Sequence, residues 1–212
     1  FQVSRQSVIN DDLSAFDEVP DKMAMGAALK VESIFWTLVL ANTGSFFAAG
    51  NGNYISGATT ALSIEGLRQA VQKMREQTDP EGNPILVSPK YLVLPPDLEA
   101  TGDQLYASAN LNSPATAENA PEGNPFKGKY QPITVPYLSN TAYTGYSTTA
   151  WYLFSDVGPW SPFGIAYLNG NASPTVESVD TAGDVLGLAW RAYLDFGVCQ
   201  IDPRGAVKSA GA

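Results

Sequence analysis

The chain has 212 residues, enough to bury a substantial core, and its 12 basic and 21 acidic residues give a formal net charge of −9. It contains one cysteine, Cys199, and no histidine. A single cysteine excludes an intrachain disulfide and a thiolate cluster for zinc or iron–sulfur. The lack of histidine excludes Ser-His-Asp and Cys-His hydrolases, His-ligated zinc enzymes and His-based acid/base catalysis within this chain.

Charge and apolar runs also limit the partners that we expect. The basic residues are scattered rather than gathered into a stripe that could follow phosphates, so we predict no sequence-specific nucleic-acid partner. The longest apolar run, Ile34 to Ala41, is far shorter than the ~20 residues that cross a bilayer. We therefore expect no membrane partner and a soluble, intracellular protein. Because the sequence begins at Phe1 without a Met, it reads as an internal part of a longer gene product.

Residues 7–42 predict helix in two pieces. Asn10-Asp11-Asp12 offers helix caps, and Pro20 fits the first turn of a second helix. In that second piece, Pro20 to Ala41, the apolar positions recur at three and four residues and form one broad stripe. The stripe consists of Ala24, Ala27, Ala28, Val31, Ile34, Phe35, Leu38 and Val39. Asn42-Thr43-Gly44 ends the helix, and residues 45–61 have a loop composition from which we expect a mobile excursion with little to bury.

The middle of the chain predicts helix and strand. Ser63 is a helix N-cap for a helix that stops near Thr78, and residues 91–94 form a short buried strand. Pro95-Pro96-Asp97 breaks the strand and starts another helix, with Pro96 in its first turn. Residues 110–129 are rich in Asn, Pro, Ala, Gly and Glu, which is typical of an irregular loop.

The rest of the chain predicts β structure. The expected turns are 169–171 and 182–184, and the last strand is long enough to bend or change type partway. The expected strands are 131–135, 150–154, 164–168, 175–179 and 185–198.

Five sequence blocks, spread almost from end to end, carry a resemblance to a known family. They are Ser4-Arg5-Gln6 with 9–13, Tyr91–Pro95 with Leu98-Glu99, Asn124-Pro125-Phe126, Ala150–Leu153, and Tyr193–Gly197 with Ile201-Asp202. In these blocks and in their order the chain resembles the Mu-like prophage major head subunits, which are tailed-phage capsid proteins of the Hong Kong 97-type shell fold. None of the blocks is a catalytic signature.

The resemblance implies an α+β fold with a long spine helix, a mixed α/β axial domain and a peripheral β region. Residues 1–45 and 163–200 would form the peripheral domain, and residues 46–162 and 201–212 the axial domain. The family's N-terminal arm and extended loop would lie upstream of Phe1, outside this chain.

The same resemblance implies a structural, non-enzymatic role without a cofactor. The chain would be a subunit of a bacteriophage or prophage icosahedral capsid that assembles into pentamers and hexamers around packaged DNA. Its partners would be copies of itself and, during assembly in the bacterial cytoplasm, a scaffold or maturation protease; its final location would be the virion.

Five charged residues are candidates for contacts between copies: Arg5, Asp11, Asp12, Arg191 and Arg204. For Asp11 and Asp12, helix capping competes with any interface role. Arg191 and Arg204 suit either a plain surface charge or an ion pair with a neighbouring subunit. No residue set predicts a metal or catalytic site.

A different function class competes with the shell subunit. Trp151, Tyr152, Trp160 and Phe163 could form a stacking platform of a carbohydrate or small-ligand binding module, although aromatic residues at this spacing in β structure are more often core. A glycosidase with a carboxylate pair is a third possibility. Neither alternative accounts for the long N-terminal helix.

Overall fold

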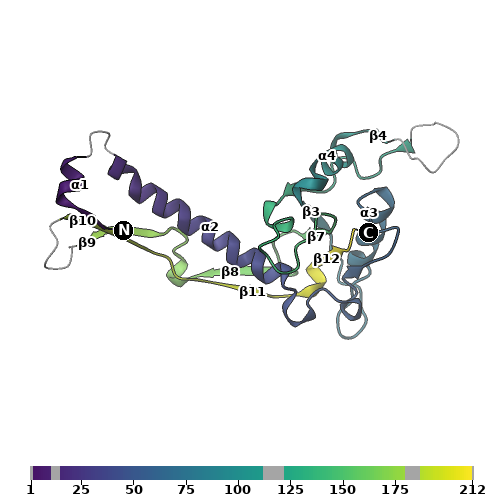
Figure 1. Ribbon diagram of the computed structural model, residues 1–212. Coiled ribbons are helices and arrows are strands. Elements are labelled where there is room, and N and C mark those ends of the chain that lie inside the picture. Colours follow the sequence, from purple (N-terminus) through teal and green to yellow (C-terminus); the bar gives the residue numbers. More distant parts are fainter. Residues whose placement is uncertain (1, 11–14, 112–121, 180–186, 212) are drawn as a thin grey trace. The chain divides into compact units, whose positions relative to one another are not determined.

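The computed structural model describes residues 2–10, 15–111, 122–179 and 187–211 (Figure 1). The chain folds into two compact units. Unit 1 comprises Phe1–Phe35 and Ile165–Val198, and unit 2 comprises Trp36–Gly164 and Cys199–Ala212.

The N-terminal helices follow the predicted two pieces. Helix α1 spans Arg5–Ile9, earlier than the predicted start at residue 7, and α2 spans Val19–Leu40, a rod of about 33 Å. Pro20 lies in the first turn of α2, where a missing N–H breaks no hydrogen bond. Asn42, with a left-handed φ of 48°, ends the helix, and its side chain exchanges two hydrogen bonds with the backbone of Phe47.

Helix α2 corrects one prediction from the sequence. Over 18 residues its mean hydropathy is 1.5, so by length and composition it could cross a membrane. The sequence prediction considered unbroken apolar runs only. Lys30 and Glu32 interrupt such a run in α2, but they lower the mean hydropathy of the helix little. Core helices of soluble proteins meet the same criterion, so this finding alone does not place α2 in a membrane.

Unit 1 contains an antiparallel sheet of three strands in the order β1-β10-β9. Strand β1 (Gln2–Ser4) was not predicted, whereas β9 (Thr175–Val179) lies where expected. The predicted long strand 185–198 is two strands, β10 (Gly187–Tyr193) and β11 (Phe196–Gln200), which break at Leu194 and Asp195. The predicted turn at 182–184 lies outside the described residues.

Strand β11 pairs with β8 (Phe163–Tyr167). At one end of this pair, the backbone N–H of Leu168 donates to the carbonyl of Asp195 at 3.1 Å. The predicted turn after β8 is confirmed: it is a short 3-10 helix, Leu168–Gly170, with a left-handed φ of 53° at Asn169.

Unit 2 is built on a mixed sheet of five strands in the order β2-β12-β7-β3-β6. In Figure 1 the yellow strand β12 can be followed beside the green β7, with which it pairs antiparallel. The strands are β2 (Tyr54–Ile55), β3 (Pro89–Leu94), β6 (Gln131–Thr134), β7 (Trp151–Ser155) and β12 (Ala206–Ser209). Three of them, β3, β6 and β7, were predicted, whereas β2 and β12 were not.

One face of this sheet packs against helix α3 (Ile64–Arg75). The predicted cap is confirmed, since the hydroxyl of Ser63 accepts from the N–H of Gly66 at 3.1 Å, although the helix ends before Thr78. Fully buried Trp151 donates its indole N–H to the carbonyl of Thr60 at 3.0 Å, which ties the segment before α3 to the central strand.

Helix α4 (Glu99–Ala107) follows β3 after a 3-10 turn, Pro96–Leu98, that starts at the predicted proline. Its buried side lies against β3 and β6. A Cβ at Gly102 would come within 2.1 Å of a Leu94 methyl carbon, so the helix approaches the sheet as closely as a glycine permits.

The other face of the sheet carries aromatic side chains. The ring centroid of Phe47 lies 5.4 Å from that of Tyr152, and Phe163 lies 4.9 Å from Phe46 and 5.6 Å from Phe154. Trp151 and Tyr152 are 0% and 1% exposed. These two aromatic residues are therefore core, and neither is available as a stacking platform for a ligand.

The segment 45–61 was predicted to be a mobile excursion, and that prediction was wrong about what it buries. Asn53 is fully buried and its side chain joins three backbone groups: it accepts from the N–H of Ala48 and donates to the carbonyls of Phe46 and Pro203, all within 3.0 Å. Composition missed this because a buried asparagine replaces apolar contacts with hydrogen bonds.

The predicted irregular loop 110–129 contains two short paired strands, β4 (Asn110–Leu111) and β5 (Glu122–Gly123), and its residues 112–121 lie outside the described ranges. After β5, Asn124 donates to the carbonyls of Leu105 and Ser108 at the end of α4. This amide fixes the turn 124–129 against the helix.

We predict that Asn53→Ala lowers the free energy of unfolding by about 2–3 kcal/mol, because it leaves three buried backbone groups without a partner. The matched control is Asn51→Ala, which removes two hydrogen bonds from an exposed side chain and should cost less than half as much. Urea unfolding followed by fluorescence measures both; equal losses would contradict the anchoring role of Asn53.

Candidate subunit interface

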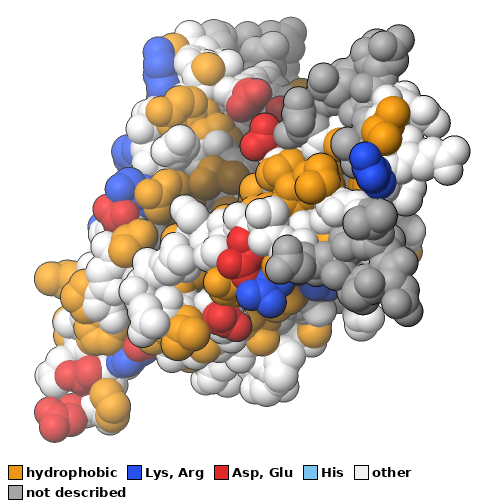
Figure 2. All heavy atoms as spheres, turned by 90° about the vertical axis from the view of Figure 1, so that its left-hand side faces the viewer, with side chains coloured by type: hydrophobic (Ala, Val, Ile, Leu, Met, Phe, Trp, Pro, Cys, Tyr) orange, Lys and Arg blue, Asp and Glu red, His pale blue; other side chains and the backbone are white. Residues whose placement is uncertain are grey.

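Unit 1 buries few apolar side chains and exposes many. Among its described residues the buried hydrophobics are Val3, Val31 and Ala189. Its exposed large hydrophobics are Ile9, Met25, Leu29, Ile165, Leu168, Leu188 and Tyr193. Figure 2 shows exposed apolar side chains in orange among charged ones. Exposed apolar surface on this scale is typical of a protein that binds another macromolecule.

The first half of α2 contributes to this exposed surface. Met25 and Leu29 are 66% and 50% exposed, and as residues four apart they lie on the same side of the helix. The sequence analysis placed a different row of residues, from Ala24 through Val39, on the apolar stripe. Val31 and Val39 of that row are buried as expected, whereas the apolar character of Met25 and Leu29 gave no signal of an outward position.

Arg191, one of the five candidate residues, lies on β10 directly opposite Glu177 of β9. Its guanidinium Nε pairs with the carboxylate of Glu177, and the Arg191 side chain is 64% exposed. Exposed ion pairs of this kind contribute little to stability. The charge of Arg191 is therefore already matched within the subunit.

Arg204, in unit 2, has a more enclosed position. Its guanidinium donates to both carboxylate oxygens of Asp202, with Nη2 2.6 Å from Oδ2, and lies 4.6 Å from the ring of Trp160. Hydrogen bonding from Arg204 lowers the pKa of Asp202. The group lines an open surface hollow of about 440 Å³ together with Asn51, Gln77, Ile201 and Pro203.

The structure does not gather the predicted interface residues into one site. Arg5 is exposed at the start of α1 in unit 1, and Arg204 belongs to unit 2. Asp11 and Asp12 lie outside the described residues. A role of any of the five at a contact between copies stays a prediction.

Little in the described part of the chain suggests catalysis. Within the described ranges, no group of three His, Cys, Asp or Glu side chains is placed to hold a metal ion. The half-buried Lys208 has a pKa lowered by burial, and its ammonium lies 5.6 Å from the ring of Tyr152 on the neighbouring strand. That environment is accounted for by sheet packing.

The decisive comparison is with families of known proteins. The sequence model of a family described as phage capsid protein matches residues 1–209. The chain belongs to the phage capsid protein family. No curated protein matches the chain.

Membership of the phage capsid protein family assigns a structural role in the virion and self-association into capsomers. The exposed apolar surface of unit 1 fits that role, because subunits of a shell bury such surface against one another. The resemblance noted from the sequence is thus confirmed at the level of a phage capsid protein.

We predict that Arg204→Ala destabilises the isolated chain by about 1–2 kcal/mol, because it removes a bidentate partner and a ring contact. Arg191→Ala should change the stability little, since its ion pair is exposed. Thermal unfolding of both variants measures the difference.

The pH dependence provides a check on this prediction. Since the pKa of Asp202 is lowered in the folded state, the stabilisation is present above the ordinary aspartate pKa and is lost as the pH falls through the lowered value. The gap between wild type and Arg204→Ala should therefore narrow in acid, to the part that the contact with the ring of Trp160 contributes. A gap that is constant from neutral pH to strong acid would contradict the pairing.

Proposed function

We propose that this chain is the shell subunit of an icosahedral bacteriophage or prophage capsid of the Hong Kong 97 type, similar to the Mu-like major head subunits. In this proposal it assembles into pentamers and hexamers that enclose the packaged DNA. The single observation that carries the proposal is that unit 1 buries few apolar side chains and exposes many. It is made in a chain that a phage capsid family matches almost end to end.

The two compact units support a division into two domains. We propose that the peripheral domain, residues 1–45 and 163–200, is built around unit 1, and that the axial domain, residues 46–162 and 201–212, is built around unit 2. The chain passes from unit 1 to unit 2 between Phe35 and Trp36, and it returns to unit 1 between Gly164 and Ile165. Both points lie close to the proposed domain bounds. The long helix α2 would be the spine helix.

The charge of the chain suits a container for DNA. A net charge of −9 gives mild repulsion rather than a tight grip on the phosphates, which would leave packaged DNA free to enter and leave. A scaffold or maturation protease would act on the subunit during assembly in the host cytoplasm. A binding module that uses the aromatic β half has no support, because Trp151 and Tyr152 are buried.

Particle size tests the proposed function. Light scattering and negative-stain electron microscopy measure the particles that the protein forms as its concentration rises. We expect shells, or rings of five and six subunits. A protein that stays monomeric at high concentration, with its scaffold and protease partners supplied, would contradict the proposed function.

We predict that Met25→Glu with Leu29→Glu prevents assembly without destabilising the subunit. Both positions are half or more exposed, and glutamate is a good helix former, so the fold should tolerate them, whereas a buried interface should not. The matched control, Met25→Leu with Leu29→Met, keeps an apolar surface and should assemble normally. Assembly of the double glutamate variant at the wild-type concentration would show that this surface of α2 faces solvent in the capsomer.

A further inference from the structure

Helix α4 in unit 2 presents an acidic cluster that the subunit does not neutralise. Glu99 and Asp103 are one turn apart on its exposed side, and Asp97 precedes them in the adjoining 3-10 turn. None of the ion pairs in the described ranges involves these three residues. The helix dipole favours Asp97 and Glu99, but it does not favour a like charge at Asp103, one turn further on.

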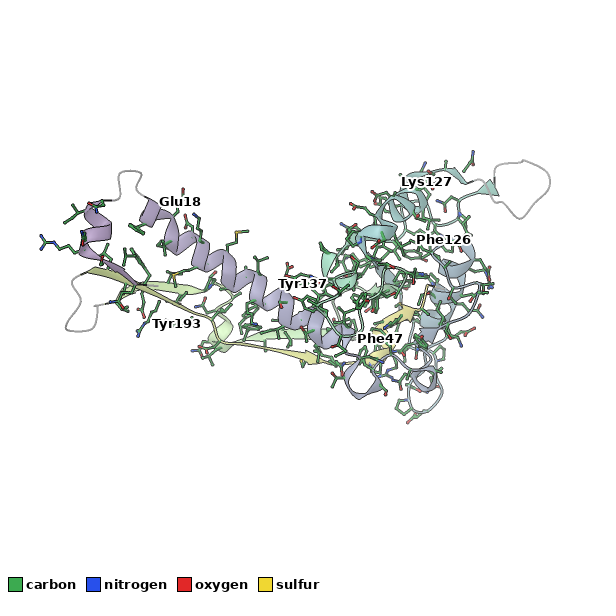
Figure 3. All side chains as sticks on the ribbon, viewed as in Figure 1. Glu18, Phe47, Phe126, Lys127, Tyr137 and Tyr193 are labelled. Atoms are coloured by element: carbon green, nitrogen blue, oxygen red, sulfur yellow. The ribbon has the colours of Figure 1, made fainter. Side chains whose placement is uncertain are left out.

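A basic cluster lies beside the other end of α4. Lys127 and Lys129 are exposed on the turn 124–129, whose Gly128 N–H donates to the carbonyl of Tyr106 at 2.9 Å. Figure 3 shows Phe126 and Lys127 in this part of unit 2. Lys127 and Lys129 form no ion pair with any side chain that the structure describes.

The cluster rests on a rigid base: Tyr130 is 7% exposed, and its ring centroid is 5.7 Å from that of Phe126, which packs against the core.

The two clusters are of opposite sign and lie along one helix about 13 Å long: Asp97 and Glu99 are at its start, Asp103 is in its middle, and the two lysines are beside its end. Among the side chains that the structure describes, no ion pair joins the two clusters. Tyr106, 39% exposed at the basic end, adds an aromatic side chain of the kind that anchors interfaces.

We propose that the acidic cluster (Asp97, Glu99 and Asp103) of one copy contacts the basic cluster (Lys127 and Lys129) of the next copy in the ring. A ring is built from head-to-tail contacts, which join two different surfaces of the same protein, and these clusters are such a complementary pair. Local attraction of this kind also lets copies with a net charge of −9 approach one another. This inference rests on the proposed function.

Charge reversal tests the contact. Glu99→Lys with Asp103→Lys, and separately Lys127→Glu with Lys129→Glu, should each raise the concentration for half-assembly by roughly tenfold. The four substitutions combined in one chain should restore assembly. Glu76→Lys with Glu81→Lys changes the net charge as much as the first variant does, at exposed positions outside both clusters, and should have little effect.

A mixture of the two reversed proteins sharpens the test. One copy then carries two basic clusters and the other mainly acidic ones, so an equimolar mixture should form even-numbered rings by alternation, while each protein alone stays mostly unassembled. Sedimentation velocity and native mass spectrometry report the ring sizes. High salt should weaken the rings of the mixture.

Three outcomes would overturn the inference. Wild type that assembles while both reversed variants assemble equally well would overturn the contact and leave the proposed function standing. Reversed variants that lose assembly without rescue by the combined chain would do the same, provided that thermal unfolding shows the monomers folded. Wild type that forms no rings or shells would overturn the proposed function and this contact together.

Discussion

The burial of strand β7 is the constraint on which unit 2 depends. It is hydrogen-bonded on both sides, to β3 and to β12, and covered on both faces, by the core around α3 and by the ring of Phe47. Trp151, Tyr152 and Leu153 in succession are at most 1% exposed. A strand enclosed in this way leaves little freedom to the sheet around it, and α4 packs on β3 and β6 of that sheet.

The two units obtain their stability in different ways. Unit 2 has a continuous apolar core and a buried asparagine, Asn53, that joins three backbone segments, so its fold is self-sufficient. Unit 1 has few buried side chains and many exposed apolar ones. This contrast suits a phage capsid protein, because apolar side chains that are exposed on one unit are available for burial against other copies.

The sequence predicted elements whose signals are local. The cap at Ser63, the proline start before α4 and the ending of α2 at Asn42 are each set by one or two neighbouring residues. Strands β1 and β12 were missed because they are short and exist only through pairing with distant strands. The sequence also did not predict the unpaired acidic residues of α4. The amino-acid sequence alone does not show which charged side chains form ion pairs within the subunit and which do not.

The place of β12 in the sheet has a consequence for the timing of synthesis. Strand β12, residues 206–209, lies between β2 and β7 in the sheet. Both neighbours are synthesised before it, so neither can pair with β12 until it has left the ribosome. Until then β7 keeps an unpaired edge, and the sheet of unit 2 is incomplete. The order of translation therefore completes the sheet of unit 2 only after residues 206–209 have been made.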